Sequence, residues 1–168
     1  MFQKLYHSFF ILLSICLLSY SLAQAQETIP ITTRELTKRA QKIIIGEVIA
    51  QHSAWDDLGR EIYTYIKLRV DRVIKSDRPD SIIVLRHLGG RVGNIESHVA
   101  GLPQFRKEEH VLVFLGPYKS TNYYGLIDWY QGKYVIKKGK TSEKVLHGTG
   151  PGHGQSVEKF INELRRYL

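Results

Sequence analysis

The clearest hydrophobic pattern in the chain is the alternation in EIYTYIKLRVDRVIK, residues 61–75. The positions on one side of this segment are apolar or β-branched apart from Arg72: Ile62, Thr64, Ile66, Leu68, Val70 and Ile74. The intervening positions are mainly tyrosines and charged residues. A period of two over so many residues predicts a long strand with one buried side and one solvent-facing side.

Further apolar runs predict five more strands. They cover residues 43–49, 82–88, 111–115, 123–129 and 133–138. The last two are predicted to form a hairpin that turns at Gln131-Gly132. Turn chemistry separates the first three strands, with Asp57 and Gly59 in SAWDDLGR and Pro79 in SDRPDS.

Two helices are predicted to flank the strands. Thr32 and Glu35 fit a capping box, which predicts a helix of about ten residues before the first strand. Ser156 is a candidate N-cap for a C-terminal amphipathic helix. The apolar stripe of that helix consists of Val157, Phe160, Ile161, Leu164 and Leu168.

Two glycine-rich segments lie between these elements. RHLGGRVGNIESHVAG, residues 86–101, follows a predicted strand, as a nucleotide-binding loop does. It lacks the spacing of the dinucleotide fingerprint and the lysine of a P-loop, so we expect the end of a strand and the loop that leaves it. HGTGPGHGQ, residues 147–155, predicts a flexible loop.

Short strands without alternating helices predict an antiparallel barrel or sandwich rather than a parallel α/β sheet. No internal repeat and no second domain is visible in the sequence. The fold class expected from the pattern is therefore mainly β, in one domain.

The N-terminus has the pattern of a signal peptide covering residues 1–25. Lys4 precedes the apolar run 9–18, and Ala23-Gln24-Ala25 is a small-x-small cleavage motif. An uncleaved anchor and a lipoprotein formed at Cys16 are the alternatives. Cleavage leaves a domain of residues 26–168, exported to the periplasm or secreted, with no stable membrane span. It also removes Cys16, the one cysteine, so no disulfide is expected.

The chain is basic, with a formal net charge of +8. Such a surface is typical of nucleic-acid binding, but an exported protein meets anionic glycans, lipids and acidic proteins instead. Aromatic and basic residues alternate in residues 121–138, as in single-strand-binding barrels, yet tyrosine and tryptophan also fill barrel cores. We expect no nucleic-acid partner.

The residues with catalytic potential do not form a recognisable motif. Two acidic pairs, Asp56-Asp57 and Glu108-Glu109, are adjacent in sequence, so on a strand their side chains face opposite sides. The histidines after residue 25 show no paired metal-ligand spacing: His52, His87, His98, His110, His147 and His153. A site assembled from distant histidines, such as His87 with His98 and His110, stays open. No catalytic residue, metal ligand or cofactor is predicted.

Four segments carry a family resemblance: AQKIIIGEV, IYTYIKLRVDRVIKS, SIIVLRHLGG and EEHVLVFLG. Over residues 40–115 they resemble the netrin-like or tissue-inhibitor-of-metalloproteinase module, as found in uncharacterised secreted bacterial proteins. The resemblance implies an OB-like antiparallel barrel of five strands flanked by helices, to which the strand pattern adds a sixth. Inhibitors of that family chelate the protease zinc through an N-terminal cysteine, which this chain lacks, so that mechanism does not carry over.

The leading hypothesis is an exported, non-enzymatic binding module. Its partner would be another secreted or envelope protein, with a protease as one candidate. The candidate binding residues are Trp55, Asp56 and Asp57, together with Arg91 and Asn94. The alternatives are a metal-assisted enzyme built on the scattered histidines and a structural envelope protein that assembles through barrel edges or its C-terminal helix. The sequence leaves the oligomeric state open.

Overall fold

The computed structural model describes residues 29–118, 122–139 and 144–168. Its elements in chain order are α2 (Thr33–Arg39), β1 (Lys42–Trp55), β2 (Ile62–Lys75), β3 (Ile82–Leu88), β4 (Gly90–Val92), β5 (Ile95–Ser97), β6 (His110–Pro117), β7 (Tyr124–Leu126), η2 (Trp129–Gly132), β8 (Lys133–Lys138), β9 (Lys144–Gly148) and α3 (Val157–Leu164). The predicted mainly β class, with one helix before the first strand and one near the C-terminus, is confirmed.

Five strands form a ring in the order β1-β2-β3-β7-β6, with β6 pairing back onto β1. All neighbours in this ring are antiparallel except β3 and β7, which run parallel. These two strands meet at one residue pair, Leu85 and Tyr124, so the ring is barrel-like rather than closed. The expectation of an OB-like arrangement is confirmed in this form, with β8 and β9 extending the sheet from β6.

The predicted hairpin of residues 123–129 and 133–138 is wrong. β7 pairs with residues 115–117 of β6 and β8 pairs with residues 111–113. The two segments therefore pair with successive parts of β6 and not with each other. The 3-10 helix η2 connects them, and Asp128 and Trp129 before and within it adopt positive φ angles of 54° and 50°. The buried Gln131 side chain accepts from Ile31 N and donates to Asp128 Oδ2, which fixes this step in the chain.

Three further expectations need correction at element ends. The first helix has seven residues rather than about ten, because Ala40 at its end is already extended. β9 covers residues 144–148, so the expected flexible loop begins as a strand paired with β8. The last helix ends at Leu164, which leaves Leu168 56% exposed instead of in the apolar stripe.

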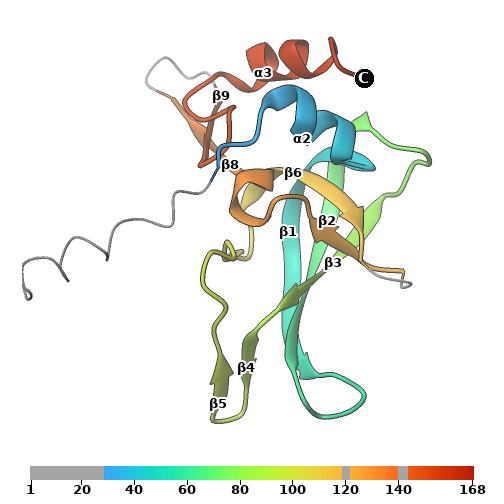
Figure 1. The fold of residues 1–168 in the computed structure, drawn as a ribbon, viewed down its shortest axis with the longest axis vertical. Coiled ribbons are helices and arrows are strands. Elements are labelled where there is room, and N and C mark those ends of the chain that lie inside the picture. Colours follow the sequence, from blue (N-terminus) through green and yellow to red (C-terminus); the bar gives the residue numbers. More distant parts are fainter. Residues whose placement is uncertain (1–28, 119–121, 140–143) are drawn as a thin grey trace, which may run out of the picture.

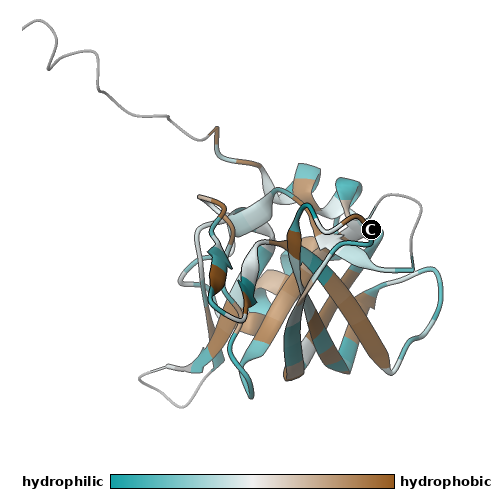
Figure 2. Ribbon diagram, turned by 90° about the horizontal axis from the view of Figure 1, so that it is seen from below, coloured by the Kyte–Doolittle hydropathy of each residue, from teal (hydrophilic) through white to brown (hydrophobic). Residues whose placement is uncertain are grey.

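Two apolar clusters hold the fold together. One lies inside the ring, where the alternation of β2 is confirmed by buried Ile66 and Leu68 next to exposed Lys67 and Arg69. The other lies between the sheet and the helices, where the rings of Phe114, Tyr134 and Phe160 contact one another at 5.5–6.2 Å. Figure 2 shows the hydrophobic residues concentrated on the strands that cross the middle of the molecule. The residues of these two clusters are Ile31, Leu36, Ala40, Ile43, Leu112, Phe114, Tyr134, Leu146, Val157, Phe160, Ile161 and Leu164 in the helical cluster, and Ile44, Val48, Ile66, Leu68, Ile83, Leu85, Phe105, Val111, Val113 and Leu115 in the ring.

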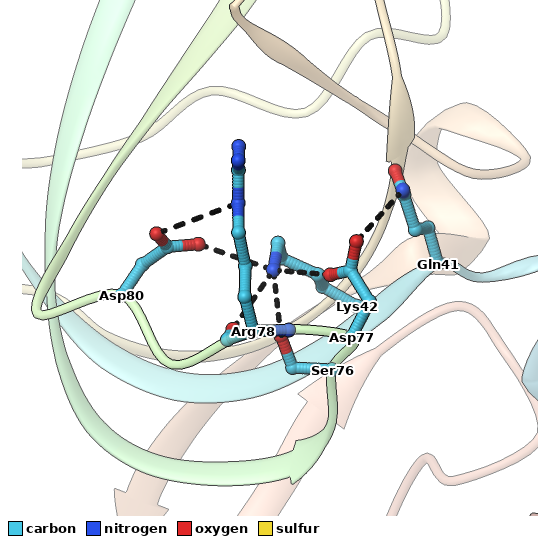
Figure 3. Close-up of polar contacts among 6 residues, drawn as sticks. All are labelled: Gln41, Lys42, Ser76, Asp77, Arg78 and Asp80. Atoms are coloured by element: carbon cyan, nitrogen blue, oxygen red, sulfur yellow. Dashed lines mark hydrogen bonds and ion pairs between the residues drawn. The ribbon is translucent and has the colours of Figure 1, made fainter.

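A buried lysine fastens the start of β1 to the turn between β2 and β3 (Figure 3). The Lys42 side chain is 1% exposed, and its Nζ donates to Ser76 Oγ at 2.6 Å and to the carbonyl of Arg78 at 3.1 Å. It also forms ion pairs with Asp77 at 2.8 Å and Asp80 at 3.1 Å. Burial by itself lowers the pKa of Lys42, but these two carboxylates outweigh it and raise the pKa above its usual value.

Candidate functional site

Two hairpins extend from the same end of the barrel (Figure 1). The pairing of β1 with β6 ends at Glu47, and beyond that point β1 continues only with β2 as a two-stranded ribbon. The β4–β5 hairpin lies beside this ribbon and contacts both of its strands. The structure therefore brings the two sequence-predicted segments, 55–57 and 91–94, to one end of the molecule.

The tip of the β1–β2 ribbon is a tight turn built on Asp56. Its Oδ1 accepts hydrogen bonds from Arg60 N at 2.6 Å and Glu61 N at 3.2 Å, and these bonds lower the pKa of Asp56. Asp56 thus shapes the turn, whereas its neighbour Asp57 is exposed. Trp55 is 39% exposed and Leu58 is 68% exposed, so two large apolar side chains reach solvent at this tip.

The expected loop at residues 90–97 contains a short hairpin, because β4 and β5 pair through three residues on each side of Gly93-Asn94. Gly90 has a φ of 136°, and a Cβ there would collide with the hydroxyls of Ser53 and Thr64. The hairpin therefore approaches the ribbon closely at its first residue. Arg91, Asn94 and Ile95 are exposed, and Ile95 is the large apolar residue of this tip at 56% exposure.

A cavity of about 410 Å³ lies between the two hairpins. Polar groups line much of it, including Ser53, Thr64, Arg91 and Glu96, while Phe105 forms part of an apolar wall. Thr64 Oγ1 donates to the carbonyl of Gly89 at 2.8 Å, so the hydroxyl of Ser53, 2.9 Å away, donates to Thr64. This chain of hydrogen bonds joins the ribbon to the residue before β4.

His87 also lines the cavity, and it is neutral at physiological pH. Burial, with a smaller contribution from the charge of Lys133, lowers the pKa of His87 to about 4. Its Nε2 is buried and has no hydrogen-bond partner. The charge of Lys133 is itself buried, with Nζ 2.5 Å from the carbonyl of Gln104 and 2.6 Å from Glu109 Oε2.

The three histidines named as an alternative metal site do not all come together. His87 and His98 line the cavity, but His98 pairs with Glu96 at 2.8 Å, and His110 lies 3.7 Å from Asp71. Within residues 29–118, 122–139 and 144–168, no group of three or more histidine, cysteine or acidic residues has an arrangement that could hold a metal ion.

The sequence singled out His87 only as part of a possible histidine metal site, and it did not indicate the Ser53–Thr64 pair as cavity residues. The period-two pattern of residues 82–88 contains the signal for His87, because it continues the side of the strand defined by Ile83 and Leu85, both buried. No comparable signal marks Ser53, since its position depends on how closely Gly90 approaches.

Among the described residues, no helix is long and apolar enough to cross a membrane. Comparison of the whole chain with protein-family models, curated proteins and solved structures finds no match. The resemblance to the netrin-like module accordingly stays a prediction.

Proposed function

We propose that this protein is an exported, non-enzymatic module that binds another secreted or envelope protein through the tips of its two hairpins. The observation that carries the proposal is the exposure of large apolar side chains at these tips. Leu58 and Trp55 on the β1–β2 tip are 68% and 39% exposed, and Ile95 on the β4–β5 tip is 56% exposed. Apolar residues gathered at one end of a molecule are typical of interaction surfaces.

The chemistry of the tips fits a protein partner. Tryptophan and arginine are enriched among the residues that contribute most to protein interfaces, and Trp55 and Arg91 lie one on each hairpin. Asp57 and Asn94 supply exposed polar groups for a rim around the apolar centre. The cavity between the hairpins has room to accept a side chain of the partner.

Export rests on the signal pattern of residues 1–25, and it defines the partner class. A protease is one candidate, through the family resemblance, although the cysteine-based inhibition of that family is not available here. Metal-assisted catalysis has no supporting arrangement among the described residues. A structural envelope role would instead show as concentration-dependent self-association.

The test is quantitative affinity capture of residues 26–168 from the envelope and secreted fractions of the host. One bait carries Leu58→Ser with Ile95→Ser at the tips. The matched control carries Val73→Ser with Ile82→Ser, two apolar residues 45% and 44% exposed in the barrel part of the sheet, away from both hairpin tips. We expect a saturable partner on the wild-type and control baits and at least about a tenfold loss on the tip bait. Equal recovery on all three baits, or no saturable partner, would contradict the proposal.

A further inference from the structure

A second cavity, of about 260 Å³, lies where the barrel ring is open. β3 and β7 meet only at Leu85 and Tyr124, and the cavity is bordered by residues 86–88, 116–118 and 125–127 around this opening. Its walls are mainly apolar. The apolar side chains include Leu88, Val99, Leu102, Leu126, Ile127 and Trp129.

One cation, Arg86, lines this apolar cavity. Its guanidinium lies 3.8 Å from the ring centre of Tyr63, 5.4 Å from that of Tyr118 and 5.9 Å from that of Tyr65. Stacking against aromatic rings holds a guanidinium in one orientation, which reduces the entropy lost when it binds an anion. It also explains why Tyr63, on the side of β2 that the sequence pattern assigns to solvent, is only 3% exposed.

No described carboxylate lies within ion-pair distance of Arg86, although the charge of Arg86 acts on Asp56 at longer range. Its Nε is buried without a hydrogen bond. The nearby acids are engaged elsewhere, since Asp56 accepts from backbone N–H groups and Glu61 Oε2 accepts from Tyr63 Oη at 2.5 Å. The buried lysines Lys42 and Lys133 differ from Arg86, because each of them contacts a carboxylate.

We propose that this opening binds a small amphiphilic carboxylate, whose apolar group fills the cavity while its carboxylate pairs with Arg86. A planar guanidinium matches the two oxygens of a carboxylate, and such a charge-assisted pair is stronger than a hydrogen bond between neutral groups. A cavity of this volume is below the range of drug-sized sites, so the ligand has about ten non-hydrogen atoms. The inference does not depend on the proposed function of the hairpins.

The test compares phenylacetate with phenylacetamide, two probes of the same shape that differ in charge, by calorimetric titration of the purified protein. We expect saturable one-to-one binding of phenylacetate and at least about tenfold weaker binding of phenylacetamide, because the amide lacks the charge-assisted bond. This comparison needs no variant. Absence of saturable binding, or equal affinities for both probes, would overturn the proposal.

Variants then locate the site. Arg86→Gln removes the charge and is expected to abolish the preference for phenylacetate, whereas Arg34→Gln, at an exposed arginine on α2, preserves it. Val99→Phe enlarges a side chain of the cavity wall and is expected to weaken both probes together. Thermal unfolding of each variant confirms that it is folded at the titration temperature. A preference that survives Arg86→Gln in the folded protein, or that is lost in Arg34→Gln, would also overturn the proposal.

Discussion

The ammonium of Lys42 lies 2.8 Å from Oδ1 of Asp77, although the two residues are 35 positions apart. Lys42 is the first residue of β1, and Asp77 belongs to the turn that connects β2 to β3. The contact therefore fixes the connection between two strands of the ring to the start of a third. Because the Lys42 side chain is 1% exposed while that of Asp77 is 53% exposed, the two partners depend on each other unequally.

This asymmetry predicts unequal costs when either side is removed. Lys42→Met leaves Asp77, whose side chain is 53% exposed and can reach water, and the buried Oδ2 of Asp80, so we expect the free energy of unfolding to fall by about 1 kcal/mol. The double variant Asp77→Asn with Asp80→Asn leaves a buried ammonium without a counter-charge, and a larger loss is expected. Urea denaturation of both proteins measures the difference. An equal or greater loss of unfolding free energy in Lys42→Met would contradict this prediction, because it would mean that the carboxylates are destabilised more by losing the lysine than the lysine is by losing them.

The lowered pKa of His87 predicts that the stability of the protein depends on pH. Its pKa is about 4 in the folded protein against an ordinary value of 6.5, so the unfolded chain binds the proton first as the pH falls. Stability from this residue is fully present above pH 6.5 and decreases toward pH 4, by up to about 3 kcal/mol. The measurement is the free energy of unfolding across this range.

His87→Leu is expected to flatten that profile. Since it removes a buried Nε2 without a partner, it is also expected to raise stability at pH 7 by about 1 kcal/mol. His98→Leu, which changes an exposed histidine at the same cavity, is the control and is expected to keep the wild-type slope. A wild-type slope in the His87 variant would mean that another group is responsible.

The close approach at Gly90 predicts that a substitution there loosens the β4–β5 hairpin. Gly90→Ala places a Cβ against the Ser53 and Thr64 hydroxyls in a backbone conformation that favours glycine, so we expect the hairpin to separate from the ribbon. Amide exchange of residues 90–97 should accelerate while that of β6 stays slow. Gly93→Ala has a positive φ of 59° but open space around its Cβ, and is expected to cost only about 1 kcal/mol. Similar exchange rates in both variants would contradict the close approach.

The parts of the fold that follow from local patterns were predictable from the sequence. Ile66 and Leu68 alternate with charged neighbours along β2, and Ser156 with Phe160 marks the cap and the buried side of α3. In these segments, burial repeats with the period of the element itself, so a short window of sequence contains the information.

The parts that depend on distant contacts were not predictable. No local signal shows that β7 and β8 pair with successive parts of β6. Their placement depends on a long-range contact, the hydrogen bond from Ile31 N to the buried side chain of Gln131. Lys42 resembles a polar strand end until its acidic partners are placed beside it. For the candidate site, turn residues such as Gly59 predicted a hairpin tip, but the meeting of the two hairpins depends on Gly90.

The most direct test of the central claim is a paired measurement on Trp55→Ala, namely its affinity for the captured partner and its midpoint of thermal unfolding. If Trp55 contacts the partner, the affinity should fall by about 30-fold or more, as for an interface residue that contributes at least about 2 kcal/mol. The unfolding midpoint should then change little, because the side chain is already 39% exposed. Unchanged affinity with a large loss of thermal stability would show that Trp55 is a packing residue and that the hairpin tips are not the binding surface.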